Sequence, residues 1–205
     1  MDQGGASLEG VGALLLASAA LMGSPGPSTI SVAAAGAAFG LRRSLGYAFG
    51  LILGTCLVLL VVATGVFAVL VSVPSLAPAL TAASAAYIVH LAIRIARAPP
   101  LRRQDPVAAA PSLTGGLLLA AANPKAYVAI GAVFAGSRLD GLSPAAGALA
   151  KSALLALMVV LIHLGWLVAG ASLSRALRDP VASRIVDVAL VLVLVATSVL
   201  AVLPR

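Results

Sequence analysis

Six long apolar segments, joined by short connections, make up most of this chain and limit what it can fold into. Each segment is long enough to cross a hydrocarbon layer of about 30 Å, which takes roughly 20 residues of helix. The connections are too short to hold a separate soluble domain. The expected spans are residues 8–39, 46–71, 77–97, 113–135, 148–173 and 181–203.

The composition places the chain among integral membrane proteins. Hydrophobic residues make up 61% of its 205 residues and charged residues 9%, whereas a soluble domain has about 25% charged residues. We therefore expect one all-α membrane domain over residues 1–205. Because no Lys or Arg precedes the first segment, we expect that segment to be a retained helix rather than a cleaved signal peptide.

The positive residues behind the net charge of +7 lie mainly in the connections between the spans. Arginines gather in the first, third and fifth connections, and the second carries no charge. Positive residues mark the cytoplasmic side, so we expect a cell (inner or plasma) membrane protein with both termini on the outer side. The charge thus indicates topology and no nucleic-acid partner. The basic connection over about 98–112 would also meet anionic lipid heads.

Two of the spans are interrupted by helix-breaking residues. The first contains Ser24-Pro25-Gly26-Pro27 and the fourth contains Asn123-Pro124-Lys125. With an odd number of spans in each half, residues 8–97 and 113–203 have opposite orientations. Matching interruptions in two such halves indicate an inverted repeat with a transport site between the breaks.

The breaks would expose backbone groups with defined polarity. Prolines 25, 27 and 124 release the carbonyls of Leu21, Gly23 and Ala120, and such oxygens suit an ammonium group. The half-helices that start near Ser28 and Lys125 present N–H groups and a positive dipole end, which suit a carboxylate. Together they match a zwitterionic amino acid. The alternative is that the prolines only kink the helices.

The motifs at the breaks resemble those of the LysE/RhtB family of amino-acid exporters. The carrying stretches are SPGPSTISVAAAGAAFGLRRSLG, GGLLLAAANPKAYVAIGAVFAG and AAYIVHLAIRIAR. The resemblance implies proton-driven export of amino acids or similar small molecules. The functional positions that it implies are Pro25, Gly26, Pro27, Asn123, Pro124 and Lys125. The chain differs from many relatives at Thr55, His90 and Asp187.

Ionisable residues inside the spans are further site candidates, because such groups are rare and functional in lipid. Lys125 could bind a substrate carboxylate, exchange a proton or snorkel to the interface. His163 could relay protons or only bond a neighbouring helix. Tyr87 and His90 share a face of the third span and could both reach the cavity, Tyr87 to bind substrate and His90 to take part in proton coupling. Asp187 could carry a proton or pair with Arg184.

Other classes of function have less support in the sequence. Candidate metal ligands, namely His90, His163, Asp187 and Cys56, lack close spacing, so we expect no metal and no cofactor. Neither GxSxG nor HExxH occurs, so an enzyme is not expected. A divalent metal exporter and a non-transporting protein of envelope-lipid traffic remain alternatives. Glycines spaced by four residues, at 46, 50 and 54, would pack helices closely inside the chain or in a homodimer.

Overall fold

The computed structural model describes two long stretches, residues 8–65 and 110–176, and nine single residues: Ser75, Pro78, Ala79, Ala82, Ala86, Val89, His90, Ile93 and Val188. Within the two stretches the regular structure is entirely α-helical, which confirms the all-α part of the expected fold class. The helices are α1 (Leu8–Leu21), α2 (Pro27–Phe39), α3 (Leu41–Ala63), α6 (Leu113–Ala122), α7 (Pro124–Gly136) and α8 (Pro144–Ala176).

The described helices include membrane-crossing lengths. Helices α3 and α8 are each long and apolar enough to span a bilayer, and α6 with α7 would make a third span bent by 61°. Helices α1 and α2 have 14 and 13 residues. Apart from single positions, the predicted spans 77–97 and 181–203 lie outside the described residues. The six-span topology and the inverted repeat therefore stay predictions.

The start of the second predicted span is corrected by the structure. We expected a connection up to residue 46, but α3 begins at Leu41 and includes Arg42 and Arg43 in its first turn. The turn from α2 into α3 is made at Gly40 alone, whose φ of 77° is a conformation that suits glycine. The arginines therefore extend from the end of a helix rather than from a loop.

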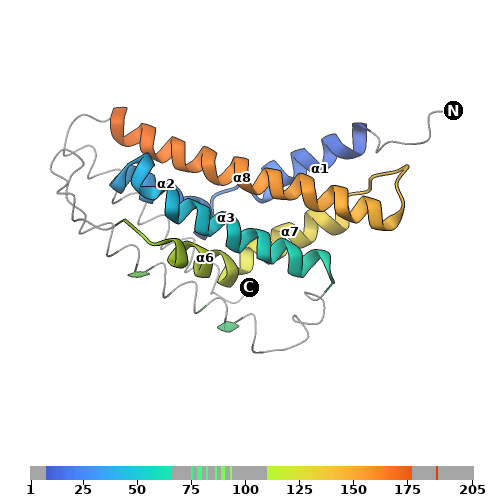
Figure 1. Cartoon of the computed structure of the whole chain (residues 1–205), viewed down its shortest axis with the longest axis horizontal. Helices are drawn as coiled ribbons and strands as arrows, with labels where there is room; N and C mark the ends of the chain where they lie inside the picture. Colours follow the sequence, from blue (N-terminus) through green and yellow to red (C-terminus); the bar gives the residue numbers. More distant parts are fainter. Residues whose placement is uncertain are drawn as a thin grey trace.

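Figure 1 shows how the helices run relative to one another. Helix α8 lies along the length of the bundle, α2 packs against it, and α6 packs against α3. The chain runs through α1 and α2 in the direction opposite to that through α6 and α7, and α3 runs opposite to α8. These directions agree with an inverted repeat, whose remaining members are not described.

Close helix packing depends on small residues. Helix α2 is buried over all 13 of its residues. A Cβ atom at Gly36 would overlap the Leu167 carbonyl of α8, and one at Gly50 would overlap the Leu113 carbonyl of α6. Gly54 lies equally close to Leu117. These glycines thus pack helices within the chain, whereas a Cβ at Gly46 would meet no atom of the described residues within 4 Å. The homodimer stays a prediction.

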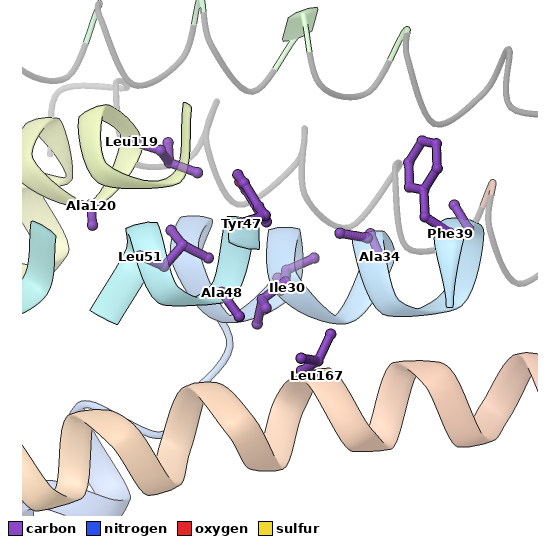
Figure 2. Packing of buried hydrophobic residues seen from close by; sticks show 12 residues of the cluster. Ile30, Ala34, Phe39, Tyr47, Ala48, Leu51, Leu119, Ala120 and Leu167 are labelled. Carbon is purple, nitrogen blue, oxygen red and sulfur yellow. The ribbon is translucent and has the colours of Figure 1, made fainter. Parts of the chain in front are cut away.

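Two apolar clusters divide the core along its length. One joins α2, α3, α6 and α8 (Figure 2), and the other joins α1, α3, α7 and α8. On α3 the clusters hold Leu51 and Val58, and on α8 they hold Leu167 and Leu155. On both helices, the residues between these positions lie between the two clusters. They line the middle of the bundle, next to both breaks.

The outward faces of the long helices are apolar. Large side chains that are more than a third exposed follow one another along α3 and α8, namely Leu45, Phe49, Leu53, Leu57, Leu60, Leu149, Leu157, Leu161, Leu164, Val168 and Leu173. Water would not favour such continuous surfaces. They suit acyl chains, as expected for a membrane protein.

The close approach of α3 to α6 can be tested with one methyl group. Gly50→Ala should lower the free energy of unfolding by about 1–3 kcal/mol through overpacking, since its Cβ meets backbone. Gly46→Ala on the same helix is the matched control and should be neutral or slightly stabilising. Thermal unfolding in detergent measures both. Equal stability of the two variants would contradict the close packing of α3 on α6.

Candidate functional site

The first break interrupts the helix for five residues. Helix α1 ends at Leu21 and α2 begins at Pro27, with Gly26 as its N-cap. Proline is favourable at the first helical position because its missing N–H would have no partner there. The Thr29 hydroxyl accepts the Gly26 N–H at 2.9 Å. This local bond fixes where the second half-helix starts.

The carbonyls that the prolines release are bonded again within the chain. Leu21 O accepts the Ser24 hydroxyl at 2.9 Å, and Gly23 O accepts the indole N–H of Trp166 at 3.1 Å. At the second break, Ala120 O accepts the Asn123 N–H at 3.2 Å. We expected these three oxygens to be open to a substrate. In this conformation they are not, because each already has a protein donor.

The second break is sharper and is built around Asn123. Its side-chain oxygen accepts the Lys125 N–H at 3.1 Å, which caps α7, and Pro124 occupies the first helical position. The Tyr127 hydroxyl donates to Ala121 O at 2.9 Å and so bonds a carbonyl at the end of α6. The 61° bend therefore leaves these backbone groups paired.

The two breaks contact each other directly. The Asn123 amide donates to the Ser28 hydroxyl at 2.9 Å, and both residues are buried. The Lys125 ammonium donates to Pro25 O at 3.0 Å and also to Ser24 O. A Cβ at Gly26 would lie 2.6 Å from Lys125 Cδ and 2.8 Å from Nζ. The absence of a side chain at position 26 thus leaves space for the Lys125 side chain to lie against the backbone.

A small cavity of about 40 Å³ lies between the breaks, α3 and α8. A buried water needs about 10–15 Å³ of such volume, so the cavity holds a few waters and no amino acid. Its polar lining comes from Ser28, Thr29, Thr55, Asn123, Lys125 and His163. Apolar side chains such as Ile130 and Ile162 complete it. The cavity is therefore smaller than the substrate-sized site expected from the sequence.

One imidazole nitrogen in this cavity has no partner. His163 is 4% exposed, and its Nδ1 lies 2.8 Å from Val159 O. Because a carbonyl only accepts, Nδ1 carries the hydrogen, and Nε2 presents a lone pair. Nε2 is buried without a hydrogen-bond partner in the described structure. His163 is thus placed to accept a proton or a donor group from the cavity.

The structure brings together most of the predicted site residues. Gly26, Ser28, Asn123, Lys125 and His163 line one cavity, and Pro25 contributes the carbonyl that accepts from Lys125. Pro27 and Pro124 begin the half-helices. His90 is exposed, and Tyr87 and Asp187 lie outside the described residues.

Four residues at the site were not among the predicted site residues: Ser24, Thr29, Thr55 and Trp166. Thr29 had a readable signal, since a hydroxyl three residues after an N-cap commonly bonds back to it. Trp166 lies three residues after His163, and so on a neighbouring part of the same helix face. Ser24 lies within the predicted first break and bonds Leu21 O locally, whereas Thr55 reaches the cavity through tertiary packing that no local pattern indicates.

Apolar helices of membrane-crossing length mark the chain as a membrane protein. The family model described as LysE type translocator matches residues 19–203. The chain therefore belongs to the LysE type translocator family, which confirms the resemblance and implies transport of small molecules. No curated protein and no solved structure matched the chain.

The bond between the breaks predicts a ranking of two variants. Ser28→Ala removes the acceptor of the Asn123 amide and should cost about 1–3 kcal/mol of stability. Asn123→Ala removes the same bond and the cap of α7, so it should cost roughly 1 kcal/mol more. Chemical or thermal unfolding of the purified variants measures this. A double variant that is no worse than Asn123→Ala alone is expected, and simple additivity would argue against the contact.

Proposed function

We propose that the protein is a secondary active exporter of an amino acid or a similar small amphoteric metabolite. It would be proton-coupled and lie in the cell membrane, with alternating access around the cavity between the breaks. Family membership supports transport of small molecules. The finer assignment to an amphoteric substrate depends on the chemistry of the cavity.

The observation that carries this proposal is the Lys125 ammonium in an apolar bundle without an acidic partner among the described residues. It is bonded to carbonyl oxygens of the opposite break and lines the cavity together with the first turn of α2. A substrate carboxylate would supply the missing counter-charge and would also meet the N–H groups of α2. Carbonyl oxygens of the first break would accept from the substrate's ammonium.

The donor set of the cavity argues against the metal-export alternative. Divalent cations need carboxylate, imidazole or thiolate groups together. The cavity instead combines one imidazole with hydroxyls, an amide and an ammonium that repels cations. Among the described residues no three His, Cys, Asp or Glu side chains form a group. The lipid-traffic alternative gives no reason for Lys125 to bridge the breaks.

His163 is the proposed site of proton coupling. His163 lines the same cavity as Lys125, and its Nε2 has no hydrogen-bond partner in the described structure. A proton on Nε2 would place a second positive charge beside the ammonium and weaken the hold of Lys125 on the break. Protonation and opening would thus be linked through charge repulsion. Asp187 and His90 remain further candidates for coupling.

Transport by membrane vesicles of inverted orientation tests the function. We expect uptake of at least one radiolabelled amino acid from a panel, stimulated by a pH gradient. Lys125→Ala should reduce uptake by about 10- to 100-fold, since charged hydrogen bonds contribute about 1.5–3 kcal/mol. Lack of uptake of every amino acid would refute the proposal.

Lys151→Ala is the matched control for Lys125→Ala. Lys151 also donates to two carbonyls, Phe134 O at 2.8 Å and Ser137 O at 3.4 Å, but it caps the end of α7 and does not line the cavity. We expect uptake close to that of the unmodified protein. Equal losses of uptake in both variants would mean that each of these lysines is needed only for folding.

The coupling role of His163 predicts a separable defect. An Asn side chain at position 163 can still donate to Val159 O but does not titrate. His163→Asn should therefore keep exchange of labelled for unlabelled substrate and lose stimulation by a pH gradient. Ser152→Ala on the same helix is the control, because its hydroxyl bonds only Ala148 O, away from the cavity. Full gradient stimulation in His163→Asn would remove His163 from the coupling scheme.

A further inference from the structure

We propose that the Ser24 and Pro25 carbonyl oxygens form a binding site for the substrate's primary ammonium group, and that the ammonium of Lys125 fills this site until substrate displaces it. We call these two carbonyl oxygens the ammonium site. The proposal rests on the function proposed above and specifies where the amine end binds. The Lys125 ammonium would thus compete with the substrate's ammonium for these two oxygens.

The ammonium site is identified by what holds each carbonyl at the first break. Leu21 O and Gly23 O are bonded by Ser24 and Trp166, and Gly26 O accepts the helical N–H of Ile30 at 2.9 Å. Ser24 O and Pro25 O are the ones that accept from a charged and flexible side chain, and Ser24 O also lies 3.3 Å from the Thr29 hydroxyl. They are the acceptors that a second ammonium could take over.

Lys125 is held in a way that allows exchange. An ammonium has three donors, and Lys125 Nζ has two hydrogen bonds in the described structure. Its side chain is partly buried and lines the cavity. A substrate carboxylate could therefore bond the open donor first. The substrate's ammonium would then replace Nζ at the carbonyls, while Lys125 stays paired with the carboxylate.

This exchange explains why a zwitterion would be selected. An amine alone would expel Lys125 into a cavity without a counter-charge among the described residues. A carboxylate alone could pair with Lys125 but would not release it from the break. A zwitterion does both, and the net charge of the site is unchanged. Release of Lys125 also frees the volume of its side chain and breaks its bonds between the two breaks.

The geometry at Gly26 allows a second test of the proposal. A Cβ there would lie 2.8 Å from Nζ of Lys125, and so just as close to any ammonium that takes its place. The backbone at Gly26 is extended, with φ of −173°, so alanine is tolerated locally. An alanine should therefore block the ammonium site without strain in the main chain.

The test uses methylammonium as the probe and the chain's single tryptophan as the reporter. Trp166 bonds the Gly23 carbonyl, next to Ser24, so its emission should respond when the site is filled. In Lys125→Met the site is vacant. We expect methylammonium to shift the emission and raise the unfolding temperature, with an affinity at least about 10-fold higher than for the unmodified protein, since a charged hydrogen bond contributes that much or more.

Two controls exclude a general salt effect. Tetramethylammonium, which has no N–H donor, should produce no response in Lys125→Met. The double variant Gly26→Ala/Lys125→Met should lose the response to methylammonium, because the added Cβ occupies the place of the ammonium. If Lys125→Met does not fold, Lys125→Gln carries the same comparison with a shorter and uncharged side chain.

The outcomes separate this inference from the exporter proposal. An equal methylammonium response in the unmodified protein and in Lys125→Met, or none in either, would overturn the ammonium site even if amino acids are exported. A response in Lys125→Met that Gly26→Ala abolishes supports the site. If vesicles then transport no amino acid, the exporter proposal fails while the ammonium site stands.

Discussion

Backbone carbonyls that lose their helical hydrogen bond must find another donor inside an apolar bundle, because lipid supplies none. The described structure meets this demand at both breaks. Local donors from Ser24 and Asn123 bond Leu21 O and Ala120 O, and distant donors from Trp166 and Lys125 bond three further carbonyls of the first break, those of residues 23, 24 and 25. The position of α8 and of the second break is thus tied to carbonyls of the first.

The division of the core follows from the same constraint. Polar groups at the breaks have to gather, so the apolar side chains of α3 and α8 form one cluster on either side of them. Close packing through Gly50 and Gly54 holds α3 against α6, the helix that leads into the second break. Small residues thus help to place the second break, although they do not line the cavity.

Sequence patterns were sufficient for the parts of this structure that depend on local chemistry. Proline and glycine predicted both interruptions, and hydropathy predicted the helices around them, because each effect acts within a few residues. The pairing of Lys125 with Pro25 O joins residues a hundred positions apart. The sequence indicated that the breaks would meet but not which carbonyl would take which donor.

Two further differences have similar causes. The helical start of α3 at Leu41 was missed because arginines in a short polar stretch resemble a loop, although Gly40 alone can make the turn. We expected the carbonyls released by the prolines to be unpaired and available to a substrate. Short hydroxyl and indole donors reach them instead, since an unpaired buried carbonyl costs about 1–3 kcal/mol.

The small cavity sets a condition on any transport cycle. Under the proposed function, a space of about 40 Å³ would have to open before an amino acid enters, and a ligand shifts such an equilibrium only by binding the open state more tightly. In the described structure Lys125 and Asn123 hold the breaks together through three hydrogen bonds. In the proposed exchange, a zwitterion would remove two of them, giving its ammonium to the carbonyls and its carboxylate to Lys125. The contact that favours the open state would then be the charge pair between the substrate's carboxylate and Lys125. Without substrate, no acidic side chain among the described residues forms this pair.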